Sequence, residues 1–247
     1  MASDLHTGSL AVIGGGVIGL SVPRRAAQAG WPVRVHRSDE RGASWVAGGM
    51  LAPHSEGWPG EERLLRLGLQ SLRLWREGSF LDGLGPQLVT AHESLVVAVD
   101  RADVADLRTV ADWLSAQGHP VIWESAARDV EPLLAQGIRH GFRAPTELAV
   151  DNRALLDALC RDCERLGVRW SSQVSSLSDV DAHTVVIANG IDAPAMATRL
   201  YALAAESDSC PCAWTTGLSG ATFGRGGRRR HPIRARARHR AGGIGSS

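Results

Sequence analysis

The sequence predicts an α/β fold with a Rossmann-like domain, and three observations support it. An apolar run at residues 10–13 is followed at once by glycines in the spacing G-x-G-x-x-G. A helix-like stretch continues to about Gly30, and a second apolar run follows at residues 33–37. Helices and strands then alternate through much of the chain to residue 194. A strand, a glycine turn, a helix and a strand within about 30 residues form the βαβ unit that binds dinucleotides.

The glycines of this turn have different expected roles. Gly14 permits the tight turn, Gly16 lets the backbone approach a diphosphate, and Gly19 lets the helix lie close to the strand. The unpaired N–H groups at the beginning of the helix, and the positive end of its dipole, then face the phosphate oxygens. The alternative is a glycine-rich turn without a ligand.

Hydrophobic periodicity predicts the remaining elements. Helices are expected at residues 60–77, 104–114 and 151–166, and strands at 95–99, 121–123, 168–174 and 184–190. The last of these strands is apolar throughout, which is typical of a parallel strand covered on both faces. An inserted, more antiparallel piece is expected around residues 86–143.

Composition excludes several classes of protein. The chain has 247 residues, a formal net charge of +1 and no lysine, so a Schiff-base lysine and a Walker A loop are excluded. No apolar run approaches the roughly 18 to 20 residues of a membrane-spanning helix. The N-terminus lacks the features of a signal peptide, and a cytoplasmic location is expected.

The four cysteines are Cys160, Cys163, Cys210 and Cys212. The first two form a C-x-x-C, which is compatible with redox or zinc chemistry. They also lie on a helical apolar stripe with Leu159, which favours two buried thiols that act as small hydrophobic side chains. We expect no metal site.

Five segments together resemble a known family. They are residues 11–19 (AVIGGGVIG), 42–44 (GAS), 47–53 (AGGMLAP), the region around Asp151, and 185–190 (VVIANG). The chain is similar in these segments, over residues 9–194, to the flavin-dependent glycine oxidases of thiamine biosynthesis, within the D-amino acid oxidase and sarcosine oxidase group.

The resemblance implies a Rossmann-like FAD-binding domain, formed by residues 1–85 and 144–194, with an incomplete mixed-sheet substrate domain at 86–143. It implies oxidation of glycine or a similar small amine by O2, giving an imine or 2-oxo acid and hydrogen peroxide, for the thiazole branch of thiamine biosynthesis. FAD is the expected cofactor, and a homo-oligomer is compatible with the family.

The resemblance also assigns the residues that would contact FAD. Carried over one by one, they are Gly14, Gly16, Val17, Ile18 and Gly19 at the diphosphate, Arg37 and Ser38 at the adenosine ribose, Ala43 and Ser44 along the phosphate and ribityl chain, Gly48, Gly49 and Met50 beside the isoalloxazine, Val174 at the adenine, and Gly190 at the second turn. No catalytic residue is assigned.

Two residues depart from the family pattern. Arg37 stands where an acidic residue usually binds the ribose hydroxyls. Two alternatives follow: Asp39 or Glu40 takes that role, or Arg37 faces a phosphate. Pro23 falls inside the first helix, where it removes a hydrogen bond at a cost of about 3 kcal/mol. We therefore expect a kink or a weakened fold there, and a higher melting temperature for Pro23→Ala.

Residues 195–247 differ from the rest of the chain. They hold nine arginines against two acidic residues, and this charge with little apolar content predicts disorder. We interpret them as a truncated or frame-shifted C-terminus. An arm that binds RNA or DNA is the alternative, although only Phe223 offers an aromatic ring after Trp214; nucleic acid is not an expected partner.

Two other functions remain open from the sequence. One is a catalytically inactive FAD-binding remnant that lacks the arginine binding the substrate carboxylate. The other is a dehydrogenase in which Arg37 contacts the 2′-phosphate of NADP. The Gly48-Gly49-Met50 segment favours flavin over NADP.

Overall fold

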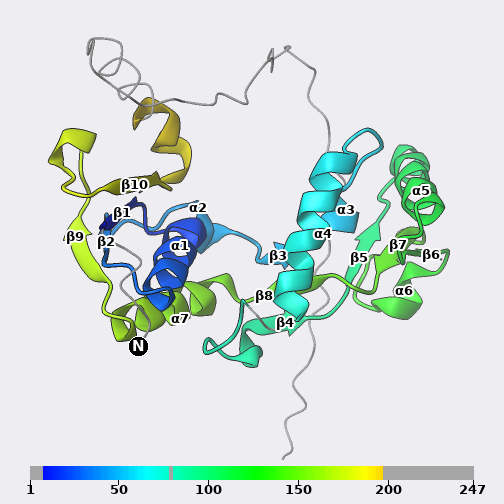
Figure 1. Cartoon of the computed structure of the whole chain (residues 1–247). Coiled ribbons are helices and arrows are strands. Elements are labelled where there is room, and N and C mark those ends of the chain that lie inside the picture. The colour runs from blue at the N-terminus through cyan, green and yellow to red at the C-terminus, as the bar shows by residue number, and fades with distance from the viewer. Residues whose placement is uncertain (1–7, 78–79, 197–247) are drawn as a thin grey trace, which may run out of the picture. The chain divides into compact units, whose positions relative to one another are not determined.

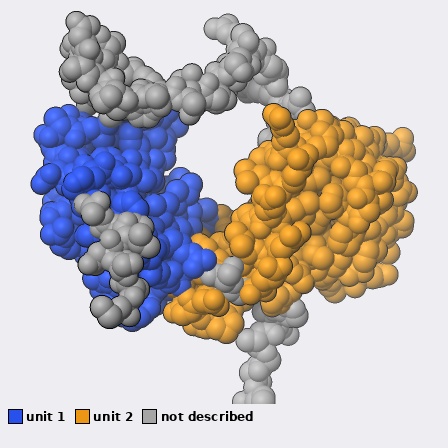
Figure 2. Space-filling model, viewed as in Figure 1, with its two compact units in different colours: residues 1–47, 156–229 blue, residues 48–155, 230–247 orange. Residues whose placement is uncertain are grey.

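The computed structural model describes residues 8–77 and 80–196. The chain divides into two compact units, which Figure 2 shows in blue and orange. In the described part, unit 1 comprises residues 8–47 and 156–196, and unit 2 comprises residues 48–77 and 80–155. The chain therefore leaves unit 1 once and returns to complete it.

Unit 1 is built on a parallel four-stranded sheet with the strand order β10-β1-β2-β9 (Figure 1). Its elements are β1 (Leu10–Ile13), α1 (Val17–Gln28), β2 (Val33–Arg37), α2 (Ala43–Val46), most of α7 (Asn152–Arg165), β9 (Arg169–Ser172), β10 (Thr184–Ile187) and two 3₁₀ turns (Leu177–Asp179 and Gly190–Asp192). The predicted βαβ unit is confirmed, and the bounds of its two strands agree with the prediction.

The core of unit 1 lies between the sheet and its helices. Val12 and Val35 of the two central strands are fully buried, and they cluster with Cys163 of α7. Val22 and Ala26 of α1 pack against the same cluster. Burying these apolar side chains stabilises unit 1 by roughly 1.5 to 3 kcal/mol for each large one.

Unit 2 contains two three-stranded antiparallel sheets, with the orders β3-β8-β4 and β5-β7-β6. Its elements are β3 (Met50–Leu51), α3 (Pro53–Glu56), α4 (Glu62–Arg76), a 3₁₀ turn (Pro86–Leu88), β4 (Val89–Ala91), β5 (Ser94–Val97), α5 (Arg101–Ala116), β6 (Ile122–Glu124), α6 (Ala127–Val130), β7 (Gly141–Ala144) and β8 (Leu148–Val150). The predicted helices and strands of this region are confirmed within a few residues.

The core of unit 2 explains where its helices form. Leu107, Val110 and Leu114 recur at helical spacing on α5 and are buried against Val96 and Phe142 of the β5-β7-β6 sheet. The helix begins after Asp100, whose side chain accepts a hydrogen bond from the Asp103 N–H at 2.9 Å.

Three expectations about the strands need correction. The strand β10 is exposed at Thr184 and only half-buried beyond it, because in the described residues it pairs with β1 alone and forms the edge of the sheet. Val174 lies outside β9, which ends at Ser172. The antiparallel strands also extend beyond residues 86–143 on both sides, because β3 pairs with β8.

Two further expectations concern Pro23 and the cysteines. The helix α1 continues through Pro23, which is buried, to Gln28. Cys163 is fully buried as predicted, whereas Cys160 is only half-buried, and neither forms a disulfide. Cys210 and Cys212, like the predicted disorder of the tail, lie outside the described residues.

The assignment of segments to an FAD-binding and a substrate domain stays a prediction.

None of the helices in residues 8–77 and 80–196 combines the length and the apolar character needed to cross a lipid bilayer.

Candidate dinucleotide-binding site

The predicted phosphate and adenosine residues meet at one edge of the unit 1 sheet. The four strands are parallel and end at Ile13, Arg37, Ser172 and Ile187, so their carboxyl ends share this edge. Gly14 follows β1 directly. Ligands of open parallel sheets bind in the crevice outside the carboxyl ends of the strands.

The glycine turn after β1 leaves no room for side chains at two positions. Gly14 has φ +123°, and a Cβ there would lie 2.3 Å from the carbonyl oxygen of Ala188. A Cβ at Gly19 would lie 2.2 Å from the carbonyl oxygen of Gly14. Backbone hydrogen bonds hold the turn, because the Gly14 N–H donates to the carbonyl of His36 at 2.8 Å. The glycines at these two positions are required by the turn itself.

Gly16 differs, because only a side chain stands near it. A Cβ at Gly16 would meet the hydroxyl oxygen of Ser44 at 2.9 Å and no backbone atom. Gly16 is the extended residue that precedes α1, without a side-chain cap. The Val17 N–H donates to the Ser44 hydroxyl at 3.0 Å, which holds α2 against this helix end.

The beginning of α1 is suited to bind an anion. Its first turn contains no acidic residue, and the exposed Ile18 does not cover it. The Val17 N–H donates to Ser44, but the N–H groups that follow it in the first turn have no partner within the helix, and together with the helix dipole they favour negative charge there. The turn at Gly14–Gly19 is therefore a cradle that fits the diphosphate of a dinucleotide such as FAD.

Arg37 ends β2 beside this cradle, and Ser38 is the first residue after the strand. The Arg37 guanidinium lies over the ring of Trp170, 4.5 Å from its centroid, and Nη1 donates to Cys160 Sγ at 3.2 Å. Ser38 is exposed at the same edge. No carboxylate of the described segments contacts Arg37, so its positive charge is not neutralised by a neighbour.

The other predicted residues of unit 1 lie on loops. Ala43, exposed, begins α2, and Val174, half-buried, follows β9 by two residues. Gly190 has φ +65° and begins the 3₁₀ turn after β10, with open space where a Cβ would be. The structure thus gathers at one edge the segments that carry eleven of the fourteen predicted residues, the glycine turn among them.

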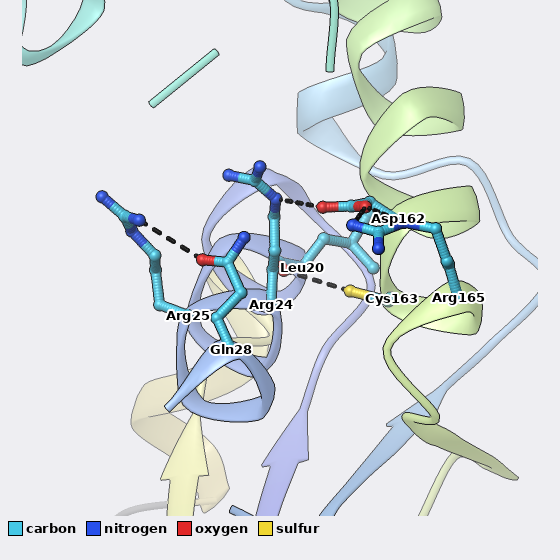
Figure 3. Close-up of polar contacts among 7 residues, drawn as sticks. All are labelled: Leu20, Arg24, Arg25, Gln28, Asp162, Cys163 and Arg165. Atoms are coloured by element: carbon cyan, nitrogen blue, oxygen red, sulfur yellow. Dashed lines mark hydrogen bonds and ion pairs between the residues drawn. The ribbon is translucent and has the colours of Figure 1, made fainter. Parts of the chain in front are cut away.

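A buried ionic cluster, which the sequence analysis missed, fixes α1 against α7 (Figure 3). The Arg24 Nε donates to Asp162 Oδ2 at 2.6 Å, and Arg165 donates to Asp162 Oδ1. Arg24 and Asp162 are almost fully buried. Burial raises the pKa of Asp162, and hydrogen bonds from the two arginines lower it by more, so that its pKa lies below the ordinary value.

Cys163 adds a second contact between these helices. Its thiol lies 3.5 Å from the carbonyl oxygen of Leu20, to which it donates a weak hydrogen bond (Figure 3). Burial and the neighbouring Cys160 raise the pKa of this thiol to about 11. Cys163 is therefore a protonated packing residue, and with Arg24 and Asp162 it positions the helix that begins at the cradle.

The predicted flavin-facing residues belong to unit 2. Gly49 has φ +71°, and a Cβ there would lie 2.0 Å from the carbonyl oxygen of Val150. Its carbonyl accepts a hydrogen bond from the Val150 N–H at 2.8 Å, and Met50 pairs with Ala149 in the sheet. Gly48 and Met50 are exposed. This segment is thus held rigidly along β8 with its side-chain face open.

A second buried cluster in unit 2 holds the turn after β3. The carboxylate of Glu147 is fully buried and accepts hydrogen bonds from the N–H groups of His54 and Ser55, at 2.7 and 2.8 Å, and from the Ser55 hydroxyl. Burial raises the pKa of Glu147 above its ordinary value, although these hydrogen bonds act to lower it.

His54 itself is buried, and neither ring nitrogen has a hydrogen-bond partner in the described residues. Burial and the nearby His119, whose ring centroid lies 5.2 Å away, lower the pKa of His54 to about 4. The imidazole is therefore neutral near pH 7, and its apolar contacts dominate its role in the turn.

Comparison with known proteins agrees with this geometry. The family model described as FAD dependent oxidoreductase (DAO) matches residues 9–234. The match includes the segments of the expected resemblance at residues 9–194 and extends to residue 234.

Two curated relatives are similar to most of the chain. A protein of Rhizobium etli named as a thiamine biosynthesis oxidoreductase, ThiO, is 32% identical over 225 residues, which are 90% of this chain and 65% of the relative. The Bifunctional protein ThiO/ThiG of Synechocystis sp. is 30% identical over 208 residues, 80% of this chain and 30% of the relative. The chain thus spans less than two thirds of the length of these relatives.

Among solved structures, the glycine oxidase from Geobacillus kaustophilus is similar with a TM-score of 0.70 and 25% identity. The similarity covers 78% of this chain and 58% of the glycine oxidase.

Proposed function

The chain belongs to the family of FAD dependent oxidoreductases (DAO), and from this we propose that it takes part in the FAD-dependent oxidation of glycine or a similar small amine. The expected products are the imine, or the 2-oxo acid formed from it by water, and hydrogen peroxide. The proposed place is the thiazole branch of thiamine biosynthesis. The similarity to the ThiO proteins and to a glycine oxidase supports both choices.

The glycine cradle is the observation that carries this proposal. Gly14 and Gly19 allow the turn to close, and Gly16 lets a diphosphate approach the N–H groups that follow Val17 at the beginning of α1. When bound, FAD supplies a two-electron acceptor that takes a hydride from the amine carbon and passes the electrons to O2. The chain itself binds and orients this group and excludes water around it.

In unit 2, Gly48, Gly49 and Met50 are proposed to contact the isoalloxazine. The positive φ of Gly49 and its hydrogen bond with Val150 keep the backbone of this segment in one conformation. A rigid wall restricts the orientation of a bound ring, and orientation is the main contribution of a protein to cofactor chemistry. The cluster of Glu147, His54 and Ser55 supports the same turn from inside unit 2.

Gly16→Ala tests the cradle without breaking the fold. The added methyl group displaces only the Ser44 hydroxyl, yet it fills the space that a phosphate would approach. We expect FAD titration, followed by flavin fluorescence, to show binding weakened at least about tenfold, the equivalent of 1.4 kcal/mol. The melting temperature without FAD is expected to change little.

Gly137→Ala is the matched control, because a Cβ at Gly137 meets nothing within 4 Å. It is expected to bind FAD as the unchanged chain does. Equal FAD affinity in Gly16→Ala, or no FAD binding by the unchanged chain, would refute the proposed cradle.

Turnover separates the proposed enzyme from the inactive remnant. Hydrogen peroxide released from glycine by the FAD-loaded chain, measured with a coupled peroxidase, supports the oxidase. FAD binding without peroxide from glycine, sarcosine or another small amine supports the remnant, which lacks the arginine expected to bind the substrate carboxylate.

A further inference from the structure

We propose that Arg37 sets the nucleotide preference of this site in favour of an adenine nucleotide that carries a phosphate group on its ribose. The inference rests on the proposed function only in that both use the cradle at Gly14–Gly19. It adds a ligand class, the 2′-phosphorylated adenine nucleotides, that competes with FAD for the cradle.

Arg37 occupies the position from which this fold reads the adenosine ribose. It is the last residue of β2, and its side chain runs along the glycine turn, since a Cβ at Gly15 would lie 3.1 Å from both Cβ and Cδ of Arg37. In dinucleotide-binding domains the residue at the end of this strand contacts the ribose. The guanidinium therefore stands next to the cradle and on its adenosine side.

The guanidinium is held in place before a ligand arrives. Trp170, opposite Val35 on β9, lies under it at 4.5 Å, and Cys160 of α7 accepts a hydrogen bond from Nη1. Within the described segments, Nε and Nη2 make no hydrogen bond to another residue. Nε and Nη2 therefore remain as donors for a ligand. Because the side chain is already held, it loses little conformational entropy when a ligand binds.

Within the described residues, no carboxylate forms an ion pair with Arg37. Asp39 and Glu40, which follow β2, are exposed and form no ion pair in the described part of the chain. The first turn of α1 lacks acidic residues as well. The guanidinium and the helix dipole therefore act in the same direction and favour an anion.

The chemistry of the side chain identifies the ligand class. A carboxylate accepts hydrogen bonds from the 2′- and 3′-hydroxyls, whereas a guanidinium only donates and matches the oxygens of a phosphate group. An arginine near this position accommodates a 2′-phosphate in other dinucleotide-binding domains. Arg37 thus loses the usual contact with a plain ribose and gains one with a phosphorylated ribose.

Two ligands that differ by one phosphate group test the proposal. Isothermal titration of the full chain with ADP-ribose and with 2′-phospho-ADP-ribose, at fixed ionic strength, is expected to show about tenfold tighter binding of the phosphorylated ligand. Arg37→Gln keeps a polar, hydrogen-bonding side chain but removes its charge, and it should bring this ratio close to one. Arg37→Glu should reverse the preference.

Arg34→Gln is the matched control. Arg34 lies on the same strand but on the opposite face, where Nη1 donates to the Ser171 hydroxyl at 3.1 Å, and the ratio should not change. Equal affinity for the two ligands, an unchanged ratio in Arg37→Gln, or binding of neither ligand would overturn the proposal. FAD titration of the same samples shows separately whether the proposed function fails, and circular dichroism confirms that each variant folds.

Discussion

Asp162 of unit 1 accepts hydrogen bonds from two arginines, whereas Glu147 of unit 2 accepts them from two backbone N–H groups and a serine hydroxyl. Both carboxyl groups are buried. The arginines hold the pKa of Asp162 below its ordinary value, and burial raises the pKa of Glu147. Burial alone therefore does not determine the charge of a carboxyl group, because its hydrogen-bond donors decide the direction of the shift.

The two clusters also hold different predicted FAD-binding segments, one in each unit. Arg24 and Asp162 join α1, which begins at the glycine cradle, to α7. Glu147 is the residue before β8, and its carboxyl group holds the turn that follows β3. Damage to the first cluster should affect the phosphate end of the site, and damage to the second should affect the proposed flavin-facing segment.

Asp162→Ala is expected to have the largest effect. It leaves the buried guanidinium of Arg24 without its carboxylate, and breaking a buried ion pair in this way costs about 3 to 5 kcal/mol of the free energy of unfolding. Urea unfolding measures this loss. FAD affinity should fall as well, because α1 loses its fixed position.

Two controls accompany this variant. Asp157→Ala removes an exposed carboxylate from the same helix and should change stability by less than about 0.5 kcal/mol. Arg24→Met combined with Asp162→Leu replaces the pair with apolar side chains and should lose less than Asp162→Ala alone. A double variant as unstable as Asp162→Ala would contradict the explanation by an unmatched buried charge.

His54 is expected to have the next largest effect, visible as a pH dependence. The folded chain keeps His54 neutral down to about pH 4, whereas an unfolded chain binds a proton below about pH 6.5. The unfolded state thus takes up more protons, and stability falls by about 3 kcal/mol as the pH drops from 6.5 to 4. His54→Phe should flatten this slope in urea unfolding at several pH values.

Glu147 and Asp162 also contribute to the pH dependence of stability, and their contributions can be distinguished from that of His54. The raised pKa of Glu147 makes the folded chain bind a proton more readily, so its contribution to stability grows as the pH falls. Glu147→Gln should therefore steepen the acid slope. Asp162, with its lowered pKa, loses its contribution to stability only when the pH falls below the ordinary pKa of an aspartate.

His92→Gln is the control, because His92 is an exposed histidine of unit 2, and this variant should keep the acid slope. A flat slope in the unchanged chain would contradict the assignment to His54.

Local sequence patterns were sufficient to predict the cradle. The apolar run at β1, the three glycines and the run at β2 follow one another within 28 residues, and Gly14 and Gly19 meet steric requirements of the turn that sequence spacing expresses directly. The same holds for α5 and α7, whose apolar stripes match their buried faces. The exposure of β10 could not be predicted in this way, because it depends on which strands pair beside it.

The two buried clusters were missed because they join residues far apart in the chain. Arg24 and Asp162 are separated by 138 positions, and His54 and Glu147 by 93. One signal was available in unit 1. Arg24 follows Leu20 by four residues and Asp162 follows Leu159 by three, so each charged residue lies on an apolar helix face. A charge of each sign on two such faces indicates a buried ion pair.

Pro23→Ala is expected to have the smallest effect. It tests whether the ion pair of Arg24 and Asp162 compensates for the proline that precedes Arg24 in α1. Pro23 removes one helical hydrogen bond just before Arg24, at a cost of about 3 kcal/mol. Alanine restores the bond, but it loses two buried methylene groups, at about 0.8 kcal/mol each, and the rigidity that proline gives the unfolded chain. The net gain of about 1 kcal/mol corresponds to a melting temperature higher by about 2 to 4 °C.

Combining Pro23→Ala with Asp162→Ala in one chain tests this link directly. If the ion pair holds α1 where Pro23 weakens it, Asp162→Ala should cost less in the Pro23→Ala background than in the unchanged chain. A coupling of about 0.5 kcal/mol or more in a double-mutant cycle of urea unfolding would support this link, because residues that act independently add within that limit. Additive effects would show that the helix tolerates Pro23 without help from Arg24 and Asp162, and that the ion pair serves only to join α1 to α7.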